Sequence, residues 1–230
     1  MRVFADGADL ASIAALAANP LIQGFTTNPT LMRQAGVEDY GVFSRQVLEL
    51  IGDRPISLEV FSDEFDQMER QARLIAGWGD NVYVKIPITN TRGESSASLV
   101  KTLTNEGVQV NVTALMTIAQ VESSVAALAG GAPACISVFA GRIGDAGVDP
   151  IPTMVKSLQL MAVEAQLELI WASPRELLNV VQAHEIGCHI ITVTHDLLKK
   201  LPTLGKDLDE FSLDTVKMFA DDAVTAGYQL

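Results

Sequence analysis

The chain has 230 residues, 48% of them hydrophobic, and carries 28 Asp and Glu against 16 Lys and Arg, a formal net charge of −12. A chain of this size and hydrophobic content can bury the core of one large α/β domain. The acidic balance argues against nucleic acid and anionic membranes as general partners, although a few local cations can still hold a small anionic substrate.

The N-terminal segment and the cysteines indicate a protein of the cytoplasm. The stretch MRVFADGADL reaches Asp6 and Asp9 before any apolar run develops, which argues against a signal peptide. No apolar run approaches the ~20 residues that a membrane-spanning helix needs. Cys135 and Cys188 lie in apolar, strand-like segments and are interpreted as reduced core thiols.

Short runs rich in Val and Ile recur along the chain, with helix-like segments between them. The expected strands are 2–6, 24–28, 56–61, 82–87, 109–116, 135–140, 167–173 and 189–194. Their starts are roughly 22 to 32 residues apart, enough for one strand, one helix and two loops. No linker interrupts the series, so we predict one (β/α)8 TIM barrel domain over residues 1–230. An open doubly wound sheet is the alternative.

Capping residues predict where several helices begin. Asp63 or Asp66 is a candidate N-cap for the helix after the third strand, and Thr117 for the helix after the fifth. Pro174 suits the first turn of a helix after the seventh strand. A final helix, 211–226, follows the eighth unit with Ser212 as its expected N-cap. Its apolar stripe is expected to pack on the barrel or on a neighbouring subunit; it consists of Leu213, Val216, Phe219 and Ala223.

Apolar and polar side chains alternate along the expected strands, and the polar ones are predicted to point into the barrel. In VYVKIP (82–87), Val82, Val84 and Ile86 share one face and Tyr83 and Lys85 the other. The wholly apolar faces then meet the outer helices. Polar side chains converge at the C-terminal strand ends, where barrel enzymes carry their sites; they are Asp6, Asn28, Glu59, Lys85, Asn111, Thr113 and Ser173.

Lys85 is the most unusual member of this set, because burying an ammonium ion costs several kcal/mol or favours the neutral amine. A neutral amine can form a Schiff base with a carbonyl, and the iminium accepts electrons from a broken carbon–carbon bond. Glu59 and Asp6 supply carboxylates for proton transfer. A simpler interpretation is a buried ion pair of Lys85 with Glu59 or Asp6. The convergence of seven polar groups favours a site.

Two arginines follow the sixth and seventh expected strands, Arg142 in VFAGRIGDAG and Arg175 in WASPRE. Arg binds phosphate through paired N–H donors, and Gly141 and Gly144 let the backbone approach an anion. Taken singly, each arginine is equally consistent with an ordinary surface residue. Together with Lys85 they favour a Schiff-base lyase or transferase that acts on a phosphorylated sugar.

Neither a metal nor an organic cofactor is predicted. His184, His189 and His195 have no metal-ligand spacing with one another or with the cysteines, which weighs against a zinc-dependent aldolase. The sequence contains no GxGxxG after a strand, no Walker A loop and no GxSxG elbow.

Five stretches together resemble the transaldolase family, namely GFTTNPTLM (24–32), VYVKIPIT (82–89), NVTALMT (111–117), SVFAGRIGD (137–145) and WASPRE (171–176). The closest resemblance is to its short-chain branch, which also contains fructose 6-phosphate aldolase. It covers nearly the whole chain. It implies a metal-free and cofactor-free enzyme that assembles into a homo-oligomer, a pentamer or a decamer, with the last helix packed on a neighbour.

The resemblance also implies a role for each candidate residue. Lys85 would form the Schiff base, Asp6 would be the acid/base at the hydroxyl of the cleaved bond, and Glu59 would shuttle protons through a water also held by Thr113. Asn28, Asn111 and Ser137 would hold the dihydroxyacetone unit, with Thr27 and Phe139 lining the same site, and Arg142, Ser173 and Arg175 would bind the phosphate.

Three positions separate the two activities of the branch. Aldolase members typically carry Gln, Ala and Tyr where this chain has Glu59, Ser137 and Phe139. The resemblance therefore implies transfer of a dihydroxyacetone unit from fructose 6-phosphate or sedoheptulose 7-phosphate to an aldose phosphate, in the pentose phosphate pathway. Release of dihydroxyacetone is the alternative. A catalytically silent sugar-phosphate sensor and a metal-free isomerase with Glu59 as its base also stay open.

Overall fold

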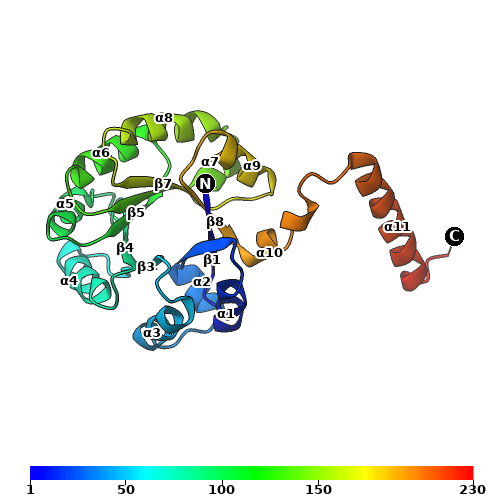
Figure 1. The fold of residues 1–230 in the computed structure, drawn as a ribbon, viewed down its shortest axis with the longest axis horizontal. Helices are drawn as coiled ribbons and strands as arrows, with labels where there is room; N and C mark the ends of the chain where they lie inside the picture. Colours follow the sequence, from blue (N-terminus) through cyan, green and yellow to red (C-terminus); the bar gives the residue numbers. More distant parts are fainter. Residues whose placement is uncertain (230) are drawn as a thin grey trace. The chain divides into compact units, whose positions relative to one another are not determined.

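The computed structural model describes residues 1–229 and divides into two units, Met1–Leu198 and Lys199–Leu230. The first unit is a closed barrel of parallel strands in the order β1 to β8, with helices around its outside (Figure 1). Each strand pairs with the next one in sequence, and β8 pairs with β1. The predicted (β/α)8 TIM barrel is confirmed, and the open-sheet alternative is wrong.

The strands lie close to their predicted positions. Two of them, at 2–6 and 82–87, match the prediction at both ends. The strand 24–28 is shifted, because Asn28 caps the next helix and Pro29 begins it. The observed strands are β1 Arg2–Asp6, β2 Ile22–Thr26, β3 Ile56–Glu59, β4 Val82–Pro87, β5 Val110–Leu115, β6 Ala134–Val138, β7 Leu167–Trp171 and β8 Ile190–Thr194.

The helices alternate with these strands, and two of the predicted starts need correction. The first-unit helices are α1 Leu10–Ala17, α2 Pro29–Gln34, α3 Tyr40–Ile51, α4 Phe65–Ala76, α5 Ala97–Asn105, α6 Ile118–Leu128, α7 Ala140–Asp145, α8 Ile151–Met161, α9 Leu178–Glu185 and α10 His195–Leu198. Thr117 caps α6 in a capping box with Gln120, as predicted. The N-cap of α4 is Glu64, because Asp63 instead binds Thr91.

The predicted start of α9 at Pro174 is also wrong, because α9 begins only at Leu178. The intervening turn is held by Asn179, whose Oδ1 accepts hydrogen bonds from the backbone N–H groups of Arg175 and Glu176. Ser173, just before the proline, has φ = 60°, a left-handed conformation that a helix cannot continue.

Hydrogen bonds between strands that are not neighbours confirm that the polar faces point inward. Asn111 of β5 donates to Ser57 Oγ of β3 at 2.9 Å, although β4 lies between these strands. Thr26 of β2 and Thr192 of β8 are 2.5 Å apart across β1. Contacts of this kind can form only through the barrel interior.

The second unit consists of a 3-10 helix, η1 Leu201–Thr203, and the helix α11 Leu208–Ala226. The expected N-cap at Ser212 is wrong, because the side chain of Asp207 caps the helix by accepting from two backbone N–H groups. The apolar stripe of α11 is exposed in the isolated chain, and its packing on a surface stays a prediction. Within the described residues, no helix is long and apolar enough to cross a membrane.

Candidate active site

Lys85 lies near the C-terminal end of β4 and is only 6% exposed. Its Nζ is 3.0 Å from Oε2 of Glu59 and donates a hydrogen bond of 2.8 Å to the backbone oxygen of Thr27. Glu59 ends β3 and is the register partner of Lys85. The ion pair of the simpler interpretation is therefore present. It fixes the amine at the functional end of the barrel.

Asp6 brings a second carboxylate to the same interior from the end of β1. Its Oδ1 accepts a hydrogen bond of 2.7 Å from Thr26 Oγ1. Burial raises the pKa of Asp6 above its ordinary value, and the Lys85 charge and the Thr26 hydrogen bond offset this only in part. A carboxyl group with a raised pKa exchanges protons more readily near neutral pH, as an acid/base group requires.

A chain of three polar side chains crosses the interior beside this pair. Ser137 Oγ donates to Asn111 Oδ1 at 2.7 Å, and Asn111 Nδ2 donates to Ser57 Oγ at 2.9 Å. Thr113 differs, because its buried hydroxyl has no hydrogen-bond partner among the described residues. Buried hydroxyl groups normally have a partner, so Thr113 is suited to hold a water or a substrate group.

The backbone next to Thr113 carries a feature that the sequence did not predict. Ala114 has φ = 66°, and the pairing of β5 with β6 shifts register between Val112 and Leu115. A bulge of this kind re-aims neighbouring side chains, and a positive φ at alanine is strained. Nothing in an Ala between Thr and Leu signals this conformation.

Thr27 and Asn28 follow β2 and are partly occupied by structural hydrogen bonds. The Thr27 hydroxyl is buried and donates to the backbone oxygen of Ser57 at 3.3 Å. Asn28 accepts from the Leu31 N–H at 3.0 Å as the cap of α2, which leaves its Nδ2 group as the available donor. Of the two, Asn28 is the better placed to bind a substrate hydroxyl through its side chain.

The two arginines follow neighbouring strands, Arg142 within α7 after β6 and Arg175 in the turn between β7 and α9. The Arg142 guanidinium is 6.0 Å from the centroid of the Phe139 ring. Arg175 pairs with Asp145, with Nε at 2.9 Å from Oδ1 and Nη2 at 2.5 Å from Oδ2. These hydrogen bonds hold the pKa of Asp145 below its usual range, and Arg142 contributes as well. The structure thus pairs Arg175 with Asp145 and brings Arg142 near enough to act on the charge of the same carboxylate.

Gly141 has a different role from the predicted one. A Cβ atom there would lie 1.5 Å from the backbone oxygen of Ser173, so glycine is needed for the close approach of α7 to the end of β7. The space that Gly141 leaves is filled by protein rather than left for an anion. Gly144 has no heavy atom within 4 Å of such a Cβ.

Two groups of residues escaped the sequence reasoning. Tyr40 of α3 donates its hydroxyl hydrogen to the backbone oxygen of Glu59 at 2.8 Å, and burial raises its pKa. No pattern in the sequence signals this contact, although α3 directly precedes β3 in the chain. Thr26 and Thr192, which fix Asp6, do follow from strand alternation, since both lie on inward-facing positions of their strands.

The described residues offer no obvious metal site. No group of three or more His, Cys, Asp or Glu side chains in this part of the chain lies close enough to hold an ion. His189 has a structural role, because its Nδ1 accepts from the Leu169 N–H at 2.9 Å. Cys135 and Cys188 are buried and unpaired thiols, as predicted.

Fold and site together define a parallel (β/α)8 barrel with a buried lysine beside two carboxylates at the C-terminal ends of its strands. The profile of the Transaldolase/Fructose-6-phosphate aldolase family matches residues 3–230. The chain belongs to this family, which is a family of enzymes.

Curated relatives are named as probable transaldolases. A "Probable transaldolase 2" of Listeria monocytogenes is 35% identical over 219 residues, covering 93% of this chain and 95% of that protein. A "Probable transaldolase" of Streptococcus pyogenes is 35% identical over 202 residues, covering 87% of this chain and 90% of its own.

Solved structures support the fold alone. A 2,3-dimethylmalate lyase aligns with a TM-score of 0.57 at 12% identity, over 99% of this chain and 84% of its own. An HpcH/Hpal aldolase/citrate lyase family protein from Burkholderia cenocepacia aligns with a TM-score of 0.59 at 16% identity, over 92% of this chain and 94% of that protein.

Proposed function

We propose that this protein is a transaldolase, which transfers a dihydroxyacetone unit from a ketose phosphate to an aldose phosphate through a Schiff base at Lys85. The observation that carries the proposal is the buried Lys85 amine, 3.0 Å from the Glu59 carboxylate at the functional end of the barrel. A buried lysine with no catalytic role would add little to the stability of the fold, because replacing a buried ion pair with hydrophobic residues often gives a protein that is at least as stable.

The proposed reaction begins with proton transfer from Lys85 to Glu59, which frees the amine to attack the C2 carbonyl of the donor. Loss of water from the carbinolamine gives an iminium ion. Asp6 then takes the proton of the C4 hydroxyl, and the C3–C4 bond breaks. Its electron pair moves to the iminium, which becomes an enamine, and an aldose phosphate leaves. The enamine attacks the acceptor aldehyde, and the steps run in reverse to release the new ketose.

The polar interior supports this sequence of steps. Asn111 is fixed between Ser57 and Ser137, so its amide can position the hydroxyl groups of the donor. The unpartnered Thr113 hydroxyl provides a place for the water that leaves and returns. Arg142 and Arg175, which both interact with the charge of Asp145, are proposed to bind the phosphate together with Ser173. We also propose a cytoplasmic homo-oligomer, in which α11 covers its apolar stripe.

Transfer is favoured over release by Glu59 and Phe139. A carboxylate at Glu59 can exchange protons while the enamine waits for an acceptor. The phenyl ring of Phe139 offers no hydroxyl that would protonate the enamine and discharge it as dihydroxyacetone. An aldolase that releases dihydroxyacetone is the second candidate, because the family includes both activities in its name.

The test is a product assay with fructose 6-phosphate, with and without erythrose 4-phosphate. A transaldolase forms sedoheptulose 7-phosphate and glyceraldehyde 3-phosphate, and only when the acceptor is present. Free dihydroxyacetone in the absence of an acceptor would assign the aldolase activity instead. Conversion of the ketose to its aldose isomer would support the isomerase, and binding without any product would support the sensor.

A further inference from the structure

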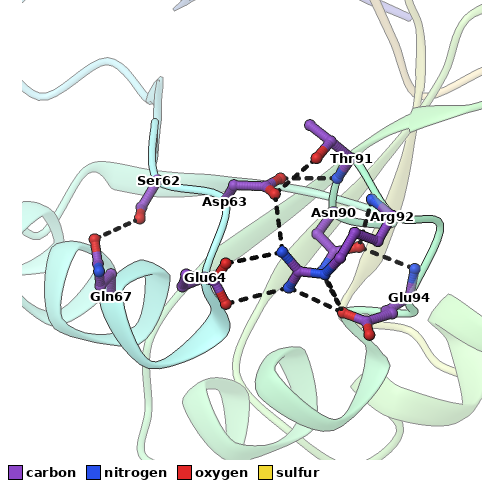
Figure 2. A network of polar contacts seen from close by, with 8 residues as sticks. All are labelled: Ser62, Asp63, Glu64, Gln67, Asn90, Thr91, Arg92 and Glu94. Atoms are coloured by element: carbon purple, nitrogen blue, oxygen red, sulfur yellow. Dashed lines mark hydrogen bonds and ion pairs between the residues drawn. The ribbon is translucent and has the colours of Figure 1, made fainter.

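A polar cluster outside the candidate site joins the two segments that follow Glu59 and Lys85 (Figure 2). The segment 60–64 leads from β3 to α4, and the segment 88–96 leads from β4 to α5. We call the cluster the clasp; it consists of Asp63, Glu64, Thr91 and Arg92. The loops after strands form the mouth of such a barrel, so the clasp lies at the functional end.

The segment 88–96 is a hairpin with a well-held tip. Thr89 and Ser95 pair as an antiparallel bridge. Asn90 is buried, and its Oδ1 accepts from the backbone N–H groups of Arg92 at 3.1 Å and Glu94 at 3.0 Å. Side-chain bonds of this kind stabilise a turn. The tip that carries Thr91 and Arg92 is therefore held by hydrogen bonds within the hairpin itself, in addition to its contacts with the other segment.

Five hydrogen bonds cross from this tip to the segment after β3, and the longest of them joins Arg92 Nη1 to Asp63 Oδ2 at 3.4 Å. The N–H and hydroxyl of Thr91 donate to the two oxygens of Asp63 at 2.8 and 2.7 Å. Nη1 and Nη2 of Arg92 donate to the two oxygens of Glu64 at 2.8 and 3.1 Å. A lone surface ion pair contributes little, but a bidentate arginine within a network is the exception.

The two segments that the clasp joins follow directly from β3 and β4, the strands that carry Glu59 and Lys85. The N–H of Val60, next to Glu59, donates to the backbone oxygen of Lys85 at 3.1 Å. In the segment after β4, the N–H of Ile88 donates to the backbone oxygen of Thr113 at 2.9 Å. The clasp thus lies just beyond the last hydrogen bond that sets the β3–β4 register at Glu59 and Lys85.

We propose that Arg92 is a positioning residue, which holds the ends of β3 and β4 together and so keeps Glu59 and Lys85 at the distance that proton transfer needs. The proposal deepens the proposed function of the same site and rests on it. Small displacements of reacting groups lower catalytic rates steeply, whereas the phosphate site at β6 and β7 lies on other strands. Loss of Arg92 should therefore lower kcat and leave KM nearly unchanged.

Arg73 provides a matched control. It joins α4 to the residue after α5, with Nε and Nη2 at 3.0 and 2.9 Å from the two oxygens of Glu106. It also pairs with Glu69 at 2.6 Å. Arg73 and Arg92 are similarly exposed, at 45% and 47%, and both connect the same two β–α units. Arg73 lies near the end of α4, away from the strand ends that carry the site.

The experiment compares Arg92→Met, Arg92→Lys and Arg73→Met by steady-state transfer kinetics and by amide hydrogen exchange of Val60. For Arg92→Met we expect kcat to fall about tenfold with KM within about twofold, and Val60 to exchange about tenfold faster. Arg92→Lys should be intermediate, because lysine keeps the charge but not the bidentate contact. Arg73→Met should lower the melting temperature alone.

Exchange at Val60 separates the two proposals, because it needs no substrate. Faster exchange in Arg92→Met but not in Arg73→Met supports the positioning role, even if the wild type shows no transfer. Absence of transfer in the wild type would reject only the proposed function. Unchanged exchange and unchanged kcat in Arg92→Met would overturn the positioning role. Equal loss of kcat in Arg92→Met and Arg73→Met would also overturn it, since general loosening would then explain both.

Discussion

The Nζ of Lys85 and Oε2 of Glu59 lie 3.0 Å apart on register partners of neighbouring strands, and both side chains are largely buried. A buried pair of this kind is costly to break from one side, because the remaining charge is left without a partner. The same pair can pass a proton without any movement of the backbone. Its geometry therefore serves both the stability of the barrel mouth and the proposed chemistry.

Phe139→Tyr should shift the reaction from transfer to release. A tyrosine hydroxyl beside the enamine can donate the proton that converts it to free dihydroxyacetone. We expect dihydroxyacetone formation from fructose 6-phosphate without an acceptor to rise about tenfold or more, in the range of general acid catalysis. Phe139→Leu is the control, because it changes the ring without adding a hydroxyl. Equal release by both variants would contradict the explanation.

Asp6→Asn should stabilise the fold while it abolishes carbon–carbon cleavage. Burial raises the pKa of Asp6 in the folded protein above its pKa in the unfolded chain. The folded state therefore loses stability as the pH rises from the unfolded-state pKa through the higher folded-state pKa, because the buried carboxyl group is forced to ionise. Asparagine removes that cost and keeps an acceptor for Thr26. The melting temperature should exceed that of the wild type at pH 8, and the difference should shrink below about pH 4.

The kinetic part of this prediction is a loss of cleavage of about 10² or more. Trapping of a ketone at Lys85 should persist in Asp6→Asn, because Asp6 is proposed to act only after the iminium has formed. A lower melting temperature than the wild type at pH 8 would show that the Asp6 charge is stabilising, contrary to the account.

Arg142→Ala should weaken the binding of phosphorylated donors alone. A charge-assisted hydrogen bond contributes about 1.5–3 kcal/mol, so KM for fructose 6-phosphate should rise about 10-fold to 100-fold. Trapping of unphosphorylated dihydroxyacetone at Lys85 should stay near the wild-type level. Arg70→Ala is the control, since Arg70 is exposed and its one ion pair among the described residues lies within α4, with Asp66. A uniform loss for both ketones would argue against a phosphate site at Arg142.

Gly141→Ala and Gly144→Ala should have opposite effects, although both change a glycine of α7 to alanine. At Gly141 the new methyl group would collide with the Ser173 backbone oxygen, so we expect a loss of about 2 kcal/mol or more. At Gly144 the space is open, and alanine should stabilise by about 0.5–1 kcal/mol. Denaturant unfolding of the two variants measures both changes in the free energy of unfolding. A Gly141→Ala variant as stable as the wild type would contradict the close contact.

The closed barrel and its polar interior could be predicted because strand alternation has a fixed period. Once β3 places Glu59 inward, the same rule places Lys85 and Asn111 inward on the next strands, and the structure confirms their contacts. Thr26 and Thr192 could have been found in the same way. The regular spacing of eight strands along the chain predicted the closed barrel and the helices between its strands.

The features that the sequence did not predict depend on tertiary contacts or on competing caps. Asp207 and Ser212 are both good N-caps, and only the backbone shows that Asp207 is used. Asp63 looks like a helix cap but instead binds Thr91 of the neighbouring loop, which follows β4. The positive φ of Ala114 has no local signal, because alanine avoids that conformation unless the surrounding barrel imposes it.

Borohydride reduction in the presence of fructose 6-phosphate, followed by peptide mass spectrometry, tests the central claim most directly. Lys85→Arg is the control, because it keeps a cation beside Glu59 but cannot form an imine. The account predicts a reduced sugar adduct on Lys85 in the wild type and none in the variant. An unmodified Lys85 in a protein that still converts the sugar phosphate would contradict it.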